Sequence, residues 1–127
     1  MNDSNTEYLY KKYPLLYKQH SLPMSESALC WGFQCGDGWL KIIDKLSEEI
    51  VKVSPTTEAT TVKEKFGKLR FYTTKDSNPD KVDKLISKAV KKSSKTCEIC
   101  GEKGKPFKST FGWLSVLCKE CIEKETK

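Results

Sequence analysis

The stretch from residue 97 to residue 121, CEICGEKGKPFKSTFGWLSVLCKEC, decides the fold of this 127-residue chain. It contains two C-x-x-C pairs, Cys97 with Cys100 and Cys118 with Cys121, and seventeen residues separate the pairs. Two residues between cysteines let one tight turn direct both thiolates at a single ion, and this spacing is typical of structural zinc sites. Four thiolates fill the tetrahedral shell that zinc prefers and leave no open position for catalysis. The sequence therefore predicts one structural zinc ion held by four cysteines.

Two other uses of these cysteines are possible, a pair of redox motifs or two disulfides. A redox C-x-x-C is expected once, near a βαβ pattern, which this chain lacks. Disulfides need an oxidising compartment, and residues 1–7 have neither the basic nor the apolar region of a secretory signal. No apolar run is long enough to span a membrane. We therefore expect a cytoplasmic protein with no membrane partner and with metal-bound cysteines.

The residues around the cysteines predict a small module of known type. Cys97–Cys100 and Gly101 are typical of a knuckle turn, residues 107–117 of a hairpin, and residues 118–124 of a short helix. Knuckle, hairpin and helix in this order resemble a treble clef. We predict an α+β single domain, with an α+β body at residues 1–95 and the zinc module at residues 96–127 packed on it as one compact unit.

Two amphipathic helices are predicted in the body. The first begins at Asp37, a plausible N-cap, and ends at Ser54-Pro55. Its apolar residues recur at helical spacing and are Trp39, Ile42, Ile43, Leu46, Ile50 and Val53. The second begins at Asn78-Pro79 and has an apolar stripe opposite a lysine face of Lys81, Lys84, Lys88, Lys91 and Lys92. A shorter helix is expected to end near Pro14.

Residues 62–74, VKEKFGKLRFYTT, predict a strand, preceded by a loop at residues 56–61. Apolar residues alternate with polar ones, but the alternation shifts by one residue at Gly67. A β-bulge produces such a shift, and a tight turn at Gly67-Lys68 produces it as well. The sequence leaves both options open and predicts a short antiparallel sheet.

Positive charge is concentrated in the middle of the chain. The formal net charge is +6, and residues 63–95 alone carry ten lysines and one arginine against four acids, a net +7. A local excess of this size favours a polyanionic partner, although a solvated lysine-rich surface has the same composition. Arg70 is the only arginine, so the chain lacks the bidentate arginines that read guanine in duplex DNA.

The predicted strand is the best candidate for a ligand-binding surface. Its polar side presents the residues Lys63, Lys65, Lys68, Arg70 and Tyr72. Basic groups beside an aromatic ring can hold phosphates and stack a base, while lysines on an exposed strand also prevent edge pairing. Tryptophans are buried on average, so the core is the expected place for all three. Trp31, beside a glycine in an irregular segment, is the best candidate among them to line a ligand pocket.

Cys30 and Cys35 allow a second metal site only if His20 or Asp37 joins them. Reduced, partly buried thiols are the simpler interpretation, and a disulfide could form in air. His20 is the only histidine, and residues 101–117 lack the histidine base of His-Asn-His nucleases. No Gly-rich phosphate loop or hydrolase motif is present. We therefore expect no catalytic residues.

Several motifs together resemble a group of small uncharacterised proteins of bacteriophages and prophages. They occur in the order Tyr13-Pro14, CGDGW (residues 35–39), VKEKFGKLRFY (residues 62–72) and C-x-x-C-G…GW…C-x-x-C (residues 97–121). The resemblance covers nearly the whole chain and implies an accessory protein that binds something made by the host.

The function we predict is a zinc-stabilised, non-enzymatic protein that binds a phosphate-bearing ligand. The ligand would be a small signalling nucleotide or a short nucleic acid, and sequestering it would counter host defence. One alternative is a protein inhibitor of a host defence factor, and a second is a nucleic-acid-processing enzyme. No feature of the sequence specifies an oligomeric state.

Overall fold

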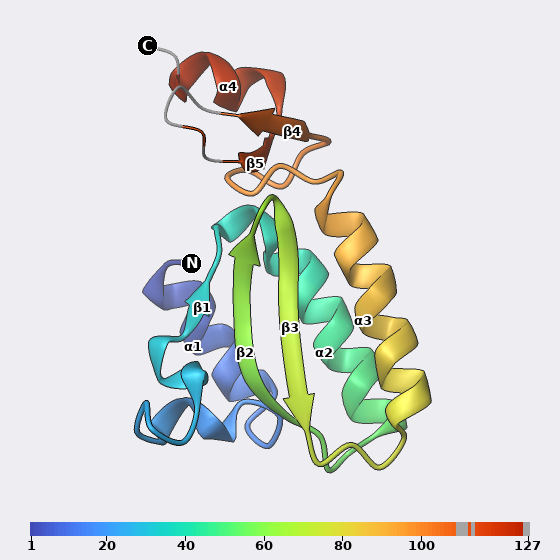
Figure 1. Ribbon diagram of the computed structural model, residues 1–127. Helices are drawn as coiled ribbons and strands as arrows, with labels where there is room; N and C mark the ends of the chain where they lie inside the picture. The colour runs from blue at the N-terminus through green and yellow to red at the C-terminus, as the bar shows by residue number, and fades with distance from the viewer. Residues whose placement is uncertain (109–111, 113, 126–127) are drawn as a thin grey trace.

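The computed structural model describes residues 1–108, 112 and 114–125 and has an α+β fold (Figure 1). The α-helices are α1 (Asp3–Lys12), α2 (Leu40–Val53), α3 (Pro79–Ser93) and α4 (Lys119–Glu125). Three 3-10 helices are η1 (Lys18–Ser21), η2 (Ala28–Trp31) and η3 (Asp37–Trp39). The strands are β1 (Phe33–Gln34), β2 (Glu58–Lys65), β3 (Lys68–Thr74), β4 (Lys105–Lys108) and β5 (Leu114–Leu117). The predicted fold class is confirmed, and in the described part of the chain no helix is long and apolar enough to cross a bilayer.

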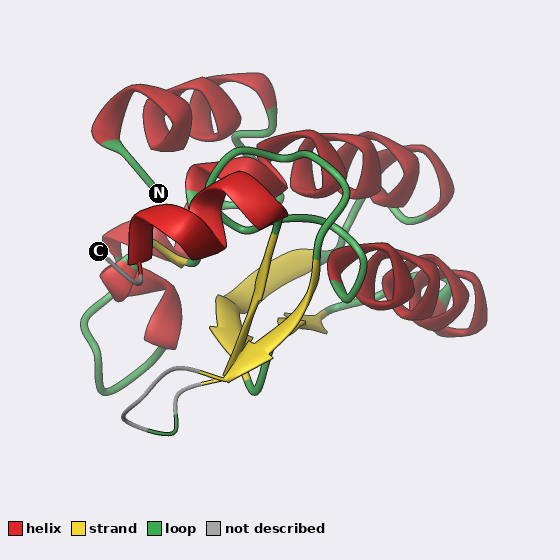
Figure 2. Cartoon of the chain, turned by 90° about the horizontal axis from the view of Figure 1, so that it is seen from above, coloured by secondary structure: helices red, strands yellow, loops and turns green. Residues whose placement is uncertain are grey.

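The body has two layers, a three-stranded sheet and a layer of helices. The strand order is β1-β2-β3, with β1 parallel to β2 and β2 antiparallel to β3. Helices α1, α2 and α3 all cover the same face of this sheet (Figures 1 and 2). Strands β4 and β5 form a separate two-stranded sheet beyond the end of the body. In the part of the chain that the structure describes, no helix covers the opposite face of the β2–β3 pair.

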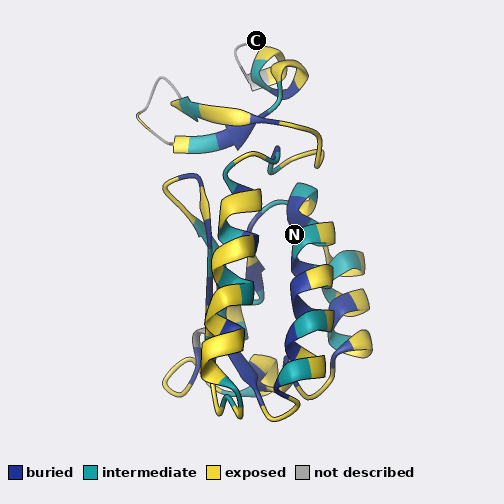
Figure 3. Cartoon of the chain, turned by 90° about the vertical axis from the view of Figure 1, so that its right-hand side faces the viewer, coloured by how far each residue is buried: buried dark blue, intermediate teal, exposed yellow. Residues whose placement is uncertain are grey.

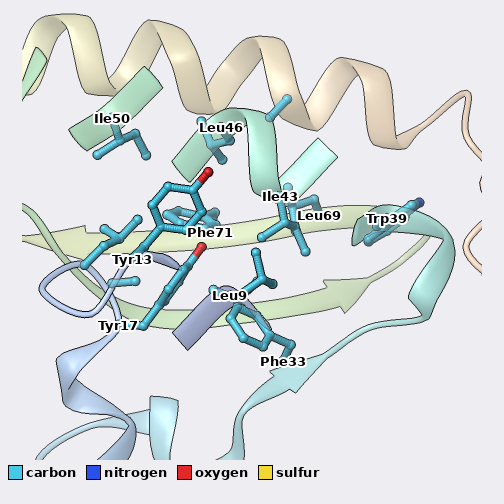
Figure 4. Packing of buried hydrophobic residues seen from close by; sticks show 14 of the residues in the cluster. Leu9, Tyr13, Tyr17, Phe33, Trp39, Ile43, Leu46, Ile50, Leu69 and Phe71 are labelled. Atoms are coloured by element: carbon cyan, nitrogen blue, oxygen red, sulfur yellow. The ribbon is translucent and has the colours of Figure 1, made fainter. Parts of the chain in front are cut away.

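The core lies between the two layers (Figure 4). Val62, Leu69 and Phe71 of the sheet are at most 3% exposed and belong to one cluster with the buried faces of the helices. Helix residues in this cluster are Leu9, Ile43, Leu46, Ile50, Val82 and Ala89, together with the fully buried Trp39. Burying one large apolar side chain contributes about 1.5–3 kcal/mol, so the predicted apolar stripes fix how the helices pack on the sheet.

The segment at residues 62–74, for which the sequence left a bulged strand and a tight turn open, is part of a hairpin. Phe66 and Gly67 form its two-residue turn, with φ angles of 54° and 77°. Positive φ at both turn residues is the type I′ geometry, whose twist matches that of paired strands. The backbone amide of Gly67 also donates to the Glu64 carboxylate at 2.9 Å. The bulge interpretation at Gly67 is therefore wrong, and the turn lies one residue earlier than the Gly67-Lys68 option.

Two local predictions in the body are also wrong. The loop predicted at residues 56–61 is largely strand, because β2 begins at Glu58. Asp37 does not cap α2, since it lies inside η3. Its carboxylate instead accepts a hydrogen bond from the backbone amide of Asn2 at 2.8 Å and one from the Asn5 side chain at 3.0 Å. The amide of Asn2 holds the pKa of Asp37 below its usual value, so this acid stabilises the start of α1.

A buried carboxylate, Glu58, is expected to make stability depend on pH. It is bonded by Gln19 at 3.0 Å, Lys18 at 3.1 Å and Lys75 at 3.2 Å. Burial alone would raise the pKa of Glu58, but these three partners outweigh it and hold the pKa below 4.5. A lowered pKa in the folded state adds stability above pH 4.5, and this contribution is lost as the pH falls through the folded pKa.

We therefore expect Glu58→Gln to lower the free energy of unfolding at neutral pH, by an amount that shrinks in acid. Urea denaturation over a pH series measures the difference from the native protein. Glu48→Gln is the matched control, because Glu48 is exposed and pairs with the exposed Lys52 at 3.4 Å. If the difference in the free energy of unfolding between Glu58→Gln and the native protein stays constant down to about pH 3, Glu58 does not have this role.

Candidate functional site

The four predicted cysteine ligands lie together at the C-terminal end of the molecule. The sulfur atoms of Cys97, Cys100, Cys118 and Cys121 are all within 4.8 Å of one another. The Sγ atoms of Cys100 and Cys118 are 3.4 Å apart. An ion with metal–sulfur bonds of about 2.3 Å places tetrahedral sulfurs about 3.8 Å apart, so the cluster fits one metal ion with four thiolate ligands.

Local backbone structure positions each cysteine pair. In the first pair the amide of Gly101 donates to the carbonyl of Cys97 at 3.0 Å, and Gly101 has a φ of 83° that favours glycine. In the second pair Cys118 follows β5 and Cys121 lies in the first turn of α4. Knuckle, hairpin and helix occur in the predicted order, although residues 109–111 and 113 of the predicted hairpin lie outside the described residues.

The surroundings of Cys97 favour its thiolate. Burial raises the pKa of this thiol, but backbone amides of Cys100, Cys118 and Ile99 hydrogen-bond to the sulfur and outweigh burial. The net effect lowers the pKa of Cys97 to about 7. Metal ions bind the thiolate rather than the thiol, so these backbone amides favour the metal-binding form of Cys97.

The first cysteine turn is attached to the body by the CGDGW segment at residues 35–39. The carbonyl of Glu98 accepts from the Gly38 amide at 2.8 Å, and its carboxylate accepts from the Gly36 amide at 2.9 Å. The indole of Trp39 donates to the carbonyl of Thr96 at 3.0 Å. We call these five residues, Gly36, Gly38, Trp39, Thr96 and Glu98, the glycine clasp.

Only glycine fits at the two glycine positions of this clasp. A Cβ atom at Gly36 would lie 2.2 Å from the carbonyl oxygen of Glu98, and one at Gly38 would lie 2.1 Å from that of Cys97. Sequence reasoning missed this role. The available signal was the pair of glycines on either side of Asp37, a segment that the sequence predicts as a helix start. The clasp shows that CGDGW positions the metal module on the body.

The hairpin brings five predicted ligand-binding residues onto one face. In the β2–β3 register Lys63 lies opposite Arg70, Lys65 opposite Lys68, and Thr61 opposite Tyr72. Alternation along the strands places these side chains on the pleat opposite the buried Val62, Leu69 and Phe71. We call Lys63, Lys65, Lys68, Arg70 and Tyr72 the basic hairpin face.

The positive charges of this face have no counter-charge among the residues that the structure describes. No carboxylate there lies within ion-pair distance of Lys63, Lys65, Lys68 or Arg70. The Nε atom of Arg70 is buried and finds no hydrogen-bond partner within residues 1–108, 112 and 114–125, which is costly for a charged donor. The Lys65 ammonium lies 5.5 Å from the ring centre of Phe66 at the hairpin turn. The face therefore combines unbalanced cations with exposed aromatic rings, because Tyr72 is 49% exposed.

The prediction that the tryptophans lie in the core holds for one of the two that the structure describes. Trp39 is fully buried, as predicted, whereas Trp31 is 62% exposed, so the prediction that it lies in the core is wrong. Trp113 lies outside the described residues. Trp31 belongs to η2, which contacts β2. Among the described residues, no hydrogen bond or ring contact joins Trp31 to the basic hairpin face, so this sixth predicted residue is not in direct contact with the other five.

Cys30 and Cys35, considered above as a possible second metal site, do not lie in a cluster of metal ligands. Cys35 is buried, Cys30 is half-buried, and no disulfide joins them. Burial raises the pKa of the Cys35 thiol to about 12. His20 stacks on Tyr10 with ring centres 4.1 Å apart, and Asp37 is bonded to the start of α1. Within residues 1–108, 112 and 114–125, the C-terminal four-cysteine group is the one metal-ligand cluster found.

Comparison of the chain with protein-family models, with curated proteins and with solved structures finds no match. The two sites that bear on function are the four-cysteine cluster and the basic hairpin face.

Proposed function

We propose that this protein is a non-enzymatic, zinc-stabilised binding protein that holds a phosphate-bearing ligand on the basic hairpin face. The observation that carries the proposal is the β2–β3 register, which sets Lys63 against Arg70 and Lys65 against Lys68, with no ion-pair partner for any of the four among the described residues. Opposed like charges in a sheet are destabilising, and a bound phosphate would offset that repulsion.

Zinc is the ion that best suits the four-cysteine cluster. Four thiolates in tetrahedral arrangement are typical of zinc or iron–sulfur sites, and the C-x-x-C spacing of the two pairs favours zinc. A closed shell of four ligands gives the ion a structural role. The module also supports the hairpin, because the side chains of Leu114 and Val116 in β5 lie against Gly67 at the hairpin turn. Metal binding would thus hold the turn of the binding surface in place.

The chemistry of the face favours a nucleotide or a short single-stranded nucleic acid. Lysine and arginine would contact phosphates, and the exposed ring of Tyr72 would stack on a base. We include Trp31 as a second stacking platform, on the basis of its exposure and the contact between η2 and β2. The single arginine argues against sequence-specific reading of duplex DNA. The phage-like motifs suggest a signalling nucleotide of host defence, sequestered without being altered.

A binding titration tests the charged residues of the face directly. A fluorescein-labelled hexathymidylate is the probe, and anisotropy measures its affinity for the full chain. We expect Arg70→Ala and Lys65→Glu each to weaken binding about tenfold while leaving the melting temperature nearly unchanged. The logarithm of affinity should fall against the logarithm of salt concentration with a slope of roughly −2 to −3, for three or four phosphate contacts on a single strand.

The control is the double variant Lys81→Glu/Lys84→Glu, which changes charge on the exposed side of α3. If this control weakens binding as much as Arg70→Ala, the attraction comes from overall charge and the face is not the site. If Arg70→Ala and Lys65→Glu unfold the protein, the residues are structural. Stoichiometric capture of a host protein, without any salt-sensitive binding of the probe, would favour an inhibitor over a nucleotide-binding protein.

A further inference from the structure

A groove between α2 and α3 is a second feature that suggests binding. These antiparallel helices pack side by side (Figure 1), and the groove along their contact has a volume of about 180 Å³. It is lined from α2 by Lys41, Ile42, Lys45, Leu46 and Glu49 and from α3 by Leu85, Lys88, Ala89 and Lys92. Leu46 and Ala89 of this lining also belong to the buried core, at 3% and 6% exposed, whereas Ile43 and Ile50, the other α2 residues of the core, do not line the groove. Figure 3 shows the exposed residues along α3 in this region.

Four lysines surround the groove and repel one another. Lys41 and Lys45 lie one turn apart on α2, Lys88 and Lys92 one turn apart on α3, and Glu49 is the single acid in the lining. Among the described residues none of the four lysines forms a salt bridge. The charge of Lys45, with a smaller contribution from Lys88, lowers the pKa of Lys92, while Glu49 acts in the opposite direction. An anionic partner would relieve this repulsion.

The floor of the groove is apolar and aliphatic. It consists of Ile42, Leu46, Leu85 and Ala89, with no aromatic ring to stack a base. A free phosphate ion would lose hydration against such a floor without gaining donors on that side. The α2 lining runs from residue 41 to residue 49, about 12 Å or two helical turns. On each rim the two lysines are spaced i,i+4, and an apolar floor lies between the rims. A partner helix with one apolar face and one acidic face is complementary to this arrangement.

We propose that the α2–α3 groove docks an acidic amphipathic helix of a partner protein. The apolar stripe of that helix lies on the floor, and its carboxylates pair with the four lysines on the two rims. This site is separate from the basic hairpin face, which lies on the side of the sheet that the helices do not cover. A protein partner and a phosphate-bearing ligand could therefore bind at the same time.

The test uses the full, metal-loaded chain and a labelled peptide of about 18 residues, long enough to form a helix when bound. Its leucines are spaced to form an apolar face, and its glutamates are spaced to form an acidic face on the opposite side of the helix. A second peptide of the same composition has the leucines spread around the helix. We expect the amphipathic peptide to bind at least tenfold more tightly than the scrambled one. Lys45→Glu/Lys92→Glu should remove most of that difference, and Lys81→Glu/Lys84→Glu should preserve it, because Lys81 and Lys84 do not line the groove.

Three results would overturn the proposal. Equal affinity for the two peptides would show attraction by charge alone. Equal weakening by the two double variants would show that the groove is not the contact site. The third result concerns inorganic tripolyphosphate. If it displaces the peptide and its binding depends on Lys45 and Lys92 as strongly as the binding of the peptide does, the groove binds a small anion instead. Binding of hexathymidylate to the basic hairpin face is measured separately, so failure here leaves that proposal standing.

Discussion

Replacing Cys118 with serine is expected to release the proposed zinc ion and to unfold the metal module. Cys118 supplies one of four sulfurs that lie within 4.8 Å of one another, and three thiolates leave the tetrahedral shell incomplete. Binding of a structural zinc ion is worth about 10 kcal/mol or more in isolated modules, which is comparable to the whole stability of a small domain. Metal analysis should show less than one ion per chain, and circular dichroism should show loss of structure at room temperature.

Cys30→Ser is the matched control, because it removes a half-buried thiol outside the cluster. That variant should keep its metal and melt close to the native protein. Purified native protein that contains no metal, with the four C-terminal cysteines paired as disulfides, would contradict the proposed role of zinc. Full metal content in the Cys118→Ser variant would contradict the ligand assignment.

Gly38→Ala is expected to produce the second large effect, although the change adds a single methyl group. The added Cβ would lie 2.1 Å from the carbonyl oxygen of Cys97 and 2.6 Å from the amide nitrogen of Gly101. These neighbours are backbone atoms of the cysteine turn, so they can move only by shifting the turn itself. Overpacking typically costs 1–3 kcal/mol, and loss of the bond from Gly38 to Glu98 adds about 1 kcal/mol. We expect a total near 3 kcal/mol in urea denaturation.

Gly67→Ala is the control for the loss of a glycine. Gly67 has a φ of +77°, but its nearest neighbours, in Leu114 and Val116, would be 3.6 Å from the new Cβ, an ordinary contact distance. Only the left-handed backbone conformation is penalised there, at about 1–2 kcal/mol. If Gly38→Ala costs no more than Gly67→Ala, the glycine clasp does not hold the module on the body.

The sequence was most informative where the local spacing of residues determines the structure. The C-x-x-C spacing places two sulfurs on one turn, and the four cysteines do meet. Helical spacing of apolar residues predicted α2 and α3, and alternation predicted which side chains of β2 and β3 share a face. In each case the pattern depends on residues close together in the chain.

The sequence was less informative where a distant segment determines the local structure. Asp37 looks like a helix cap, but its partners are Asn2 and Asn5 at the start of α1. Gly36 and Gly38 are explained only by the backbone near Glu98, sixty residues away. The shift of alternation at Gly67 fits a bulge or a turn equally well, and the turn forms because Phe66 also adopts a positive φ.

The proposed function requires that the protein binds a phosphate-bearing ligand and releases it unchanged. The most direct measurement incubates the metal-loaded protein with a panel of cyclic and ADP-ribose-type nucleotides and separates bound from free by ultrafiltration. The protein is then heat-denatured, and the supernatant is analysed by chromatography. We predict that one nucleotide is depleted from the filtrate and recovered intact, and that Arg70→Ala prevents the depletion. Recovery of a cleaved product, or no depletion of any nucleotide in the panel, would contradict the proposed function.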